Sequence, residues 1–345
     1  MKKALSVLLV ALMLLSVLSA CSSNTAPAPA PAPAEQSQAS SAESAQPAPA
    51  PAEPAEDDGL LVGFASAAAN VFFDGIDVGL RDVFEPLGGQ VIRADADGSV
   101  VTEMANIENF ITMGCDLVVI SPFDSAGSCE AIRKLNDANI PVICTVGVPD
   151  GDCEYLTVVK SDDFNSATVL AEWVFEQMNY EGEVVIVEGR QSSDCIDRCD
   201  GYIAACEKYG IKIAGSFMDE GLSVASCQNA VENLMTAHPN AKAVLGYCGF
   251  VLPGAIAAFQ SMGIEDVICV DVDGLPAETD LIKSGEAAHC AVVGQSPRDF
   301  GRTAGNIFLE YQKDPSTTFE PITLVPTTLI TKDNVDEWDA YSYAQ

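Results

Sequence analysis

Histidine and basic residues are scarce in this sequence of 345 residues. It has two histidines, His238 and His289, and 17 Lys and Arg against 50 Asp and Glu, which gives a net charge of −33 at pH 7. Two isolated histidines argue against a histidine-rich metal site and against most histidine-based acid–base catalysis. Nucleic-acid binding needs clustered Lys and Arg to neutralise phosphates, so we expect no nucleic-acid partner for so acidic a chain.

The motifs of common enzyme classes are missing as well. The sequence contains no Gly-x-Ser-x-Gly motif, no phosphate-binding glycine loop and no histidine–carboxylate motif. Each of these motifs places a nucleophile, a phosphate cradle or a catalytic base at a fixed spacing. We therefore expect that the protein is not an enzyme and that it needs no cofactor.

The N-terminus has the parts of an export signal. Met1-Lys2-Lys3 is basic, residues 4–20 are almost wholly apolar, and small residues precede Cys21. A basic start followed by a short apolar centre is typical of a secretory signal. Leu18-Ser19-Ala20-Cys21 resembles the bacterial lipobox, which implies a signal peptide over residues 1–20 and lipidation of Cys21. The alternatives are an ordinary signal peptide followed by a chance cysteine, and a retained membrane anchor.

Residues 22–58 are rich in proline and alanine. Repeated Ala-Pro favours polyproline II, and the segment lacks the apolar side chains that offset the entropy of folding. We therefore interpret residues 21–58 as a lipidated cysteine and a semi-rigid tether. They would hold a folded domain, residues 59–345, at the extracytoplasmic face of the cell membrane.

Residues 59–345 alternate between short apolar runs and segments with helical spacing. The apolar runs, rich in Val and Ile, are 60–65, 117–120, 141–145, 183–188, 243–246 and 267–270. The helical segments are 71–84, 100–113, 126–138, 166–178, 194–209, 223–237, 252–262 and 297–311. This alternation predicts an α/β fold with parallel sheets and helices on both faces, and its length predicts two lobes.

Polar or aromatic residues follow nearly every predicted strand, and ligands of open α/β sheets bind beyond these carboxyl ends. Eight segments, some at these strand ends and some in helices, form an ordered set: 70–73, 121–125, 138–143, 161–163, 197–202, 233–239, 272–274 and 295–297. In order and spacing they resemble the landmarks of the periplasmic ribose-type sugar-binding proteins. The resemblance implies the type I periplasmic binding protein fold, in which two Rossmann-like lobes are joined by a three-strand hinge. Lobe 1 is then about 59–161 and 296–323, and lobe 2 about 162–295 and 324–340.

The resemblance also implies a function. It implies a substrate-binding lipoprotein of an ABC importer, which captures a monosaccharide or a similar small polar solute between two closing lobes. The implied partners are this ligand, an ABC permease and the membrane, and the protein is expected to be a monomer. A lipoprotein that presents a quorum signal or a sugar to a membrane receptor is the alternative, since it would use the same fold and tether.

The ligand contacts of the family can be carried over by position. They fall on Asn70, Phe72, Phe73, Arg198, Asp273 and Gln295, with Ser161 near a hinge. The two phenyl rings suit the apolar face of a sugar ring. Asp273 can accept hydrogen bonds from hydroxyls, Arg198 can donate to them, and the two amides can do both.

The sequence departs from the ribose pattern at several contact positions. Val146-Gly147 stand where the pattern has Asp-Arg, Ser121 and Cys248 stand where it has Asn, Arg190 replaces an apolar residue and Leu222 an aromatic one. We keep Ser121, Arg190 and Cys248 as candidate ligand-binding residues. The departures indicate a solute other than ribose, either a different sugar or a smaller or anionic ligand that uses Arg190.

Of the 12 cysteines, all but Cys21 lie in the folded part, and their odd number excludes complete pairing. Cys144 and Cys269 lie in apolar runs and are typical of small buried hydrophobic residues. Cys195 and Cys199 are one helical turn apart, but no other ligand at metal-binding spacing accompanies them, so we expect no metal site. Free thiols are the preferred interpretation, with Cys195 and Cys248 as candidates to line the cleft.

Overall fold

The computed structural model describes residues 59–339, and Cys21 and the tether lie outside the described residues. The first elements are β1 (Leu61–Ser66), α1 (Val71–Phe84), the 3-10 helix η1 (Glu85–Leu87), β2 (Gln90–Asp95), α2 (Val100–Met113), β3 (Leu117–Ile120), α3 (Ser125–Asp137), β4 (Val142–Thr145) and β5 (Val158–Lys160). Next come α4 (Asp163–Gln177), β6 (Glu183–Glu188), α5 (Ser193–Tyr209), β7 (Lys212–Met218), α6 (Val224–Ala237), β8 (Ala241–Gly246), α7 (Val251–Met262), β9 (Ile268–Asp273), α8 (Pro276–Ser284) and β10 (Ala291–Gly294). The last are α9 (Pro297–Lys313), β11 (Ile322–Leu324), β12 (Thr328–Ile330) and the 3-10 helix η2 (Val335–Glu337).

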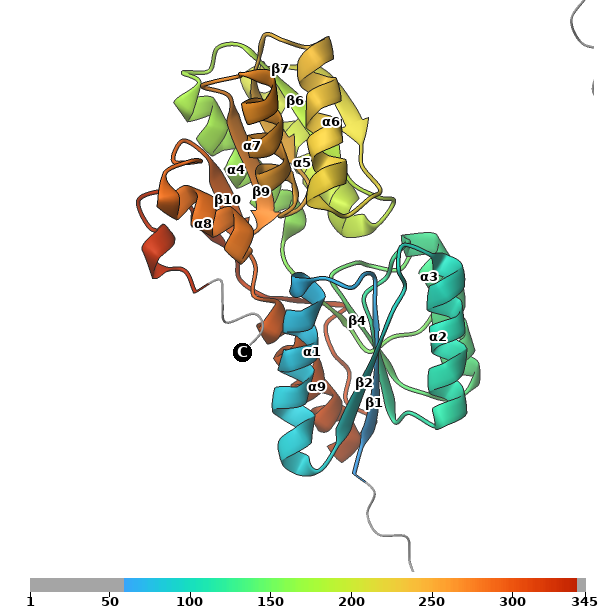
Figure 1. Ribbon diagram of the computed structural model, residues 1–345. Coiled ribbons are helices and arrows are strands. Elements are labelled where there is room, and N and C mark those ends of the chain that lie inside the picture. Colours follow the sequence, from blue (N-terminus) through green and yellow to red (C-terminus); the bar gives the residue numbers. More distant parts are fainter. Residues whose placement is uncertain (1–58, 340–345) are drawn as a thin grey trace, which may run out of the picture. The chain divides into compact units, whose positions relative to one another are not determined.

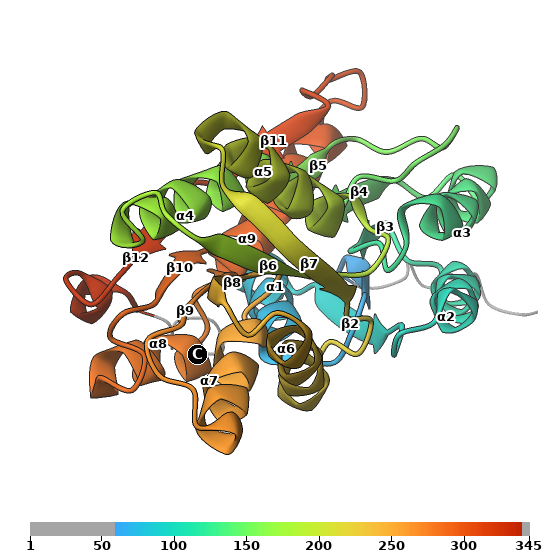
Figure 2. The same cartoon turned by 90° about the horizontal axis from the view of Figure 1, so that it is seen from above.

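The strands form two six-stranded sheets, one in each lobe. Their orders are β11-β5-β4-β3-β1-β2 in lobe 1 and β12-β10-β9-β8-β6-β7 in lobe 2. Only the β10–β12 pairing is antiparallel. The helices pack in pairs, α1 with α9 and α2 with α3 in lobe 1, and α4 with α5 and α6 with α7 in lobe 2 (Figure 1). Figure 2 shows the strands of lobe 2 between these helix layers.

The chain passes from one sheet to the other after β5, after β10 and after β11. Each crossing is short, and α9 packs on α1 of lobe 1 although it follows the last parallel strand of lobe 2. Strands of each lobe are therefore assembled from distant parts of the sequence. The predicted fold, two parallel α/β lobes joined by three connections, is confirmed.

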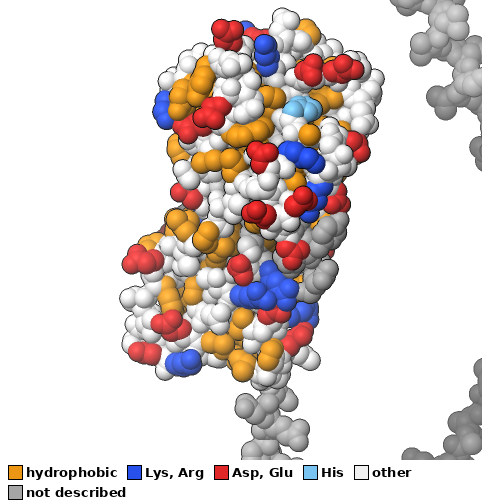
Figure 3. Space-filling model, turned by 90° about the vertical axis from the view of Figure 1, so that its left-hand side faces the viewer, with side chains coloured by type: hydrophobic (Ala, Val, Ile, Leu, Met, Phe, Trp, Pro, Cys, Tyr) orange, Lys and Arg blue, Asp and Glu red, His pale blue; other side chains and the backbone are white. Residues whose placement is uncertain are grey.

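Charged side chains are dispersed over the surface. Figure 3 shows Asp and Glu scattered over one face, with Lys and Arg between them. Several form ion pairs, such as Asp82 with Arg298 and Arg302 on neighbouring helices of lobe 1. Exposed pairs of this kind contribute little to the stability of the fold. The excess of acidic side chains therefore affects mainly the solubility of the protein.

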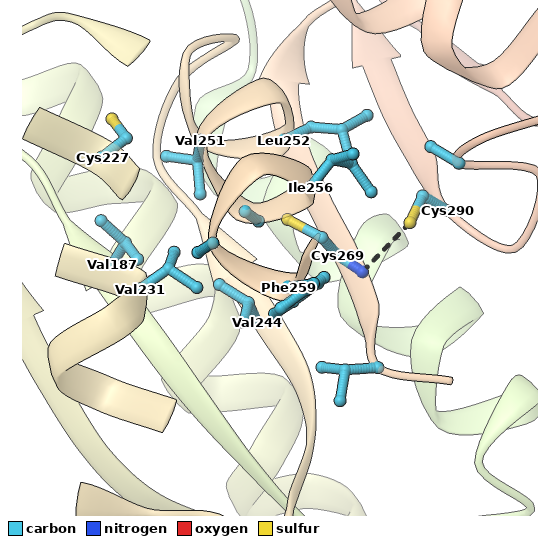
Figure 4. Close-up of a cluster of buried hydrophobic side chains, with 14 of the residues drawn as sticks. Val187, Cys227, Val231, Val244, Val251, Leu252, Ile256, Phe259, Cys269 and Cys290 are labelled. Atoms are coloured by element: carbon cyan, nitrogen blue, oxygen red, sulfur yellow. Dashed lines mark hydrogen bonds between the residues drawn. The ribbon is translucent and has the colours of Figure 1, made fainter. Parts of the chain in front are cut away.

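Each lobe has apolar clusters on both faces of its sheet. Figure 4 shows the cluster of lobe 2 in which Val231 and Phe259 pack with Cys269 and Cys290. The backbone N–H of Cys269 donates to Sγ of Cys290 at 3.3 Å. Cys144 and Cys269 are both fully buried, which confirms the prediction that they act as small hydrophobic residues.

The described part of the chain contains no helix that is both long and apolar enough to cross a membrane. Between residues 59 and 339 there is also no cluster of three His, Cys, Asp or Glu side chains placed to hold a metal ion. All eleven cysteines in this range are free thiols.

Candidate ligand-binding site

The carboxyl ends of the two sheets face a narrow cavity of about 30 Å³ between the lobes. Its wall is formed by Asn70, Phe72, Phe73 and Val146 of lobe 1 and by Arg190, Asp194, Cys195, Arg198, Leu222, Tyr247, Cys248, Phe250 and Asp273 of lobe 2. A cavity of this size holds about one or two water molecules. A sugar therefore needs the lobes to part or the wall to move before it can enter.

Lobe 1 contributes the start of helix α1. The Asn70 side chain caps this helix, because its Oδ1 accepts from the backbone N–H groups of Phe72 at 3.1 Å and Phe73 at 3.3 Å. The cap satisfies donors that have no partner within the helix and leaves the amide nitrogen of Asn70 for a ligand. The rings of Phe72 and Phe73 are nearly perpendicular, with centroids 5.4 Å apart, and both are buried in the core of lobe 1. The two rings are thus core residues that also line the cavity.

Arg198 is held rigidly in lobe 2. Its Nε and Nη2 both lie 2.9 Å from Oδ1 of Asp163, and its Nη1 donates to the carbonyl of Tyr247 at 2.6 Å. Arg198 therefore pairs across helices with Asp163, and not with Asp194 or Asp197 on its own helix surface. Burial raises the pKa of Asp163 to about 6, although Arg198 and Lys160 oppose the rise.

Asp273 ends β9 with both carboxylate oxygens engaged. Oδ2 accepts from the backbone N–H of Gly249 at 2.9 Å, and Oδ1 accepts from Nε2 of Gln295 at 2.7 Å. Nη1 of Arg198 lies 3.9 Å from the same Oδ1. Behind the strand end, Glu278 accepts from the N–H groups of Gly274 and Leu275, which fixes the turn that presents Asp273.

Three residues of the cavity wall have unusual backbone conformations. Val146, Leu222 and Asp273 have φ values of 69°, 46° and 154°, a range that L residues rarely adopt. For a β-branched residue such as Val146 this conformation is particularly costly. Such strain persists where the surrounding structure enforces it, and it is enriched at binding sites.

Residues 190–193 of lobe 2 contact lobe 1 directly. Nε of Arg190 donates to the carbonyl of Phe123 at 2.9 Å, and the guanidinium lies 5.8 Å from the centroid of the Phe123 ring. The Ser193 N–H donates to Oγ of Ser125 at 3.0 Å, and the Val148 N–H donates to Oγ of Ser193 at 2.6 Å. These bonds join the lobes beside the cavity, as in a closed form.

The structure places most of the predicted ligand-binding residues in the cavity wall. These are Asn70, Phe72, Phe73, Arg190, Arg198, Cys248 and Asp273. Ser121, Ser161 and Gln295 lie outside it. The hydroxyls of Ser121 and Thr145 form a hydrogen bond of 2.6 Å. Oγ of Ser161 is buried without a hydrogen-bond partner among the described residues. Gln295 donates to Oδ1 of Asp273 and so contacts a wall residue without lining the cavity itself.

A model of the periplasmic binding protein domain matches residues 62–314. The chain belongs to the periplasmic binding protein family. Within it, the chain is of the ribose and simple-sugar type, which confirms the resemblance seen in the sequence.

The family includes curated relatives and solved structures similar to this chain. The ribose import binding protein RbsB of Escherichia coli is 26% identical over 237 residues, which cover 68% of this chain and 79% of that protein. The protein of the same name from Bacillus subtilis is 25% identical over 250 residues, with 69% and 77% covered. The crystal structure of a galactofuranose binding protein superposes with a TM-score of 0.75 at 24% identity, covering 81% of this chain and 96% of that one.

The ligand-binding candidates from the sequence lack six wall residues of this periplasmic binding protein, which are Val146, Asp194, Cys195, Leu222, Tyr247 and Phe250. Tyr247 directly follows β8, so its position at the end of a strand could have identified it as a candidate. Its hydroxyl donates to Asp219 at 2.9 Å. Phe250 precedes α7, and no pattern in the sequence separates it from that helix. Asp194 lies in the first turn of α5 and does not directly follow a strand.

Proposed function

We propose that this chain is the extracytoplasmic substrate-binding component of an ABC importer and that it captures a monosaccharide or a similar neutral polyol. The observation that carries the proposal is the composition of the cavity wall. Apolar rings from one lobe, Phe72 and Phe73, face hydrogen-bonding groups from the other, Arg198 and Asp273. A sugar offers both surfaces, an apolar ring face and hydroxyls that donate and accept.

The charges in the wall favour a neutral ligand over an anionic one. Arg190 lies 3.8 Å from Asp194, and Arg198 is paired with Asp163 and lies near Asp273. Each guanidinium therefore has a carboxylate partner before a ligand arrives. An additional negative group would meet Asp194 and Asp273 in a poorly solvated space, which is unfavourable.

The names of similar proteins support the same class of solute. Relatives and neighbours are described as binding proteins for ribose, galactofuranose and myo-inositol, and these are neutral rings that bear hydroxyls. Val146-Gly147 and Cys248 stand where the ribose pattern has charged or amide side chains. We therefore propose a neutral polyol other than ribose.

A solute screen tests the proposal. Residues 22–345 are mixed with D-ribose, D-allose, D-galactose, L-arabinose, myo-inositol and, as anionic control, D-glucuronate. One neutral compound is expected to raise the melting temperature, because a ligand at about 100 times its Kd stabilises by about 2.7 kcal/mol. Equilibrium dialysis should then give one bound solute per chain. Binding of glucuronate alone, or of no compound in the panel, would contradict a neutral sugar-like ligand.

The same fold also serves receptors. A similar structure is the fructose binding periplasmic domain of a hybrid two component system, at 20% identity and a TM-score of 0.73. A likeness of this degree concerns the fold alone, so the receptor function remains the second candidate. Deletion of the gene should abolish uptake of the labelled solute if the chain serves an importer. Normal uptake with a lost transcriptional response would favour the receptor.

We further propose that Cys21 carries lipid and that residues 22–58 tether the binding domain to the cell membrane. The support is the lipobox-like segment before Cys21 and the proline-rich composition after it. Several acyl chains on one cysteine anchor a protein stably. Radiolabelled palmitate should enter the wild-type chain and be absent from Cys21→Ser, which should appear in the medium. Equal labelling of both chains would overturn the anchor.

A further inference from the structure

Asp194 combines deep burial with an unused acceptor. Its side chain is about 4% exposed and forms part of the cavity wall. Oδ2 accepts from Sγ of Cys195 at 3.5 Å and lies 3.8 Å from Nη2 of Arg190. Oδ1 is buried and has no hydrogen-bond partner among residues 59–339. A buried carboxylate oxygen without a donor is unfavourable and rare in folded proteins.

The surroundings keep this carboxylate charged. Burial acts to raise its pKa, but Arg190 and then Arg198 outweigh that effect and hold the pKa at about 2. The hydroxyl of Ser192 also favours the charged form, although it does not reach hydrogen-bonding geometry with Oδ1. A charged acceptor binds a hydroxyl more strongly than a neutral one does, so Oδ1 is suited to an O–H donor.

Lobe 1 supplies no donor side chain opposite this oxygen. A Cβ atom placed on Gly147 would lie 3.6 Å from Oδ1 of Asp194, so the oxygen lies close to the segment of lobe 1 that follows β4. That segment, Val146-Gly147, has no side chain that can donate a hydrogen bond. Oδ1 therefore lacks a donor from Val146-Gly147 of lobe 1, and the hydroxyl of Ser192 in its own lobe is buried nearby without forming a hydrogen bond to it.

We propose that Asp194 contacts the solute directly, that its Oδ1 accepts a hydrogen bond from a hydroxyl of the bound polyol, and that it determines specificity at that hydroxyl. The inference rests on the proposed function, since it assumes that the cavity binds a hydroxylated solute. Recognition by charged groups then comes from two pairs in lobe 2, Asp194 with Arg190 and Asp273 with Arg198. A solute that lacks this hydroxyl, or carries a carboxylate there, is rejected.

Two variants at Asp194 test the contact, with a panel compound that binds the wild type as the probe. Asp194→Asn keeps the size of the side chain and removes its charge, and it should weaken binding by about 30-fold. The apo protein should lose some stability, because Arg190 then keeps no charged carboxylate partner, so binding is measured well below the melting temperature of the variant. Asp197→Asn is the matched control, since Asp197 lies on the same helix, is 41% exposed and pairs with Lys160 outside the cavity. It should bind within about twofold of wild type.

Gly147 offers a second test that leaves Asp194 in place. Gly147→Ser places a hydroxyl where it can donate to Oδ1, so it should compete with the solute, weaken binding and raise the apo melting temperature. Gly147→Ala adds the same Cβ without a donor, and the space around that atom permits it. The alanine variant should therefore bind more tightly than the serine variant. Equal affinities of the two would contradict the role of Oδ1.

The outcomes separate the two proposals. If the wild type binds no neutral compound of the panel, the proposed function fails and the contact fails with it. If the wild type binds and Asp194→Asn binds within threefold, only the contact at Asp194 is overturned. A series of monodeoxy analogues of the probe completes the test. One position should lose affinity for wild type while losing none for Asp194→Asn.

Discussion

Asp273→Asn is expected to weaken solute binding by at least about 100-fold while the protein remains folded. Both oxygens of Asp273 accept from fixed donors, the N–H of Gly249 and Nε2 of Gln295, and Arg198 lies nearby. An amide has a single oxygen, so its NH₂ group would face one of these donors. The variant therefore lacks the negative charge that strengthens a hydrogen bond from a solute hydroxyl. Its amide must also rotate to avoid placing NH₂ against a donor.

Isothermal titration calorimetry with the identified solute measures this effect. Asp266→Asn is a suitable control, because Asp266 lies on the surface of the same lobe at a φ of 63°, which asparagine tolerates. The control should bind as the wild type does. If Asp273→Asn binds within threefold of wild type, Asp273 is not a ligand contact and the cavity binds its solute elsewhere.

The central strands and the helices could be predicted closely from the sequence. Strands β3 and β6 are buried on most positions, and their runs of Val, Ile and Leu have no polar interruption. The bounds of α1 and α2 coincide with the helical spacing in the sequence. Caps at Asn70 and Ser99 reinforce that pattern locally. Burial on both faces and local capping are properties that a short window of sequence records.

Two edge strands could not be predicted from the sequence, because an edge strand is not buried on both faces and so forms no apolar run. Strands β2 and β7 each lie at one edge of their sheet, and most of their positions are partly or fully exposed. Their sequences, QVIRAD and KIAGSFM, therefore mix polar, small and apolar residues and form no apolar run. Strand β10 was missed although it is buried, because it has only four residues and ends in glycine.

The sequence predicts that the site lies at the carboxyl ends of the strands, but it does not predict the contacts between the side chains of the site. The strand-end rule and the family resemblance selected Arg198 and Asp273, and both lie in the cavity wall. Neither predicts that Arg198 pairs with Asp163, because that contact depends on how α4 packs against α5. Ser121 follows β3 directly, yet its short side chain reaches Thr145 and not the cavity. The length of a side chain relative to the cavity and the packing of one helix on another depend on the tertiary structure. The sequence alone therefore cannot show which of these residues line the cavity.

Arg198→Met is expected to lower the free energy of unfolding by about 3 to 5 kcal/mol at pH 7.5, the usual effect of removing one partner of a buried ion pair. Arg198 and Asp163 are 3% and 2% exposed, so the variant leaves the Asp163 carboxylate with Lys160 as its remaining partner, at 3.2 Å. Methionine fills much of the space of the arginine stem, which limits the loss of packing. Urea denaturation followed by circular dichroism measures the change.

The dependence of this loss on pH identifies its electrostatic origin. The folded-state pKa of Asp163 is raised to about 6, above its ordinary value, so the stability linked to it is present at low pH and is lost as the pH rises through 6. Without Arg198 that pKa rises further, and at pH 5 the carboxyl is protonated and tolerates burial. The difference between Arg198→Met and wild type should therefore be clearly smaller at pH 5 than at pH 7.5. The double variant Asp163→Asn/Arg198→Met should recover stability at pH 7.5, because it leaves no unpaired buried carboxylate.

Lys208→Met is the control, because it breaks an exposed pair with Glu172. It should lower the free energy of unfolding by less than about 1 kcal/mol at either pH. A loss that is the same at both pH values, with no recovery in the double variant, would assign the role of Arg198 to packing.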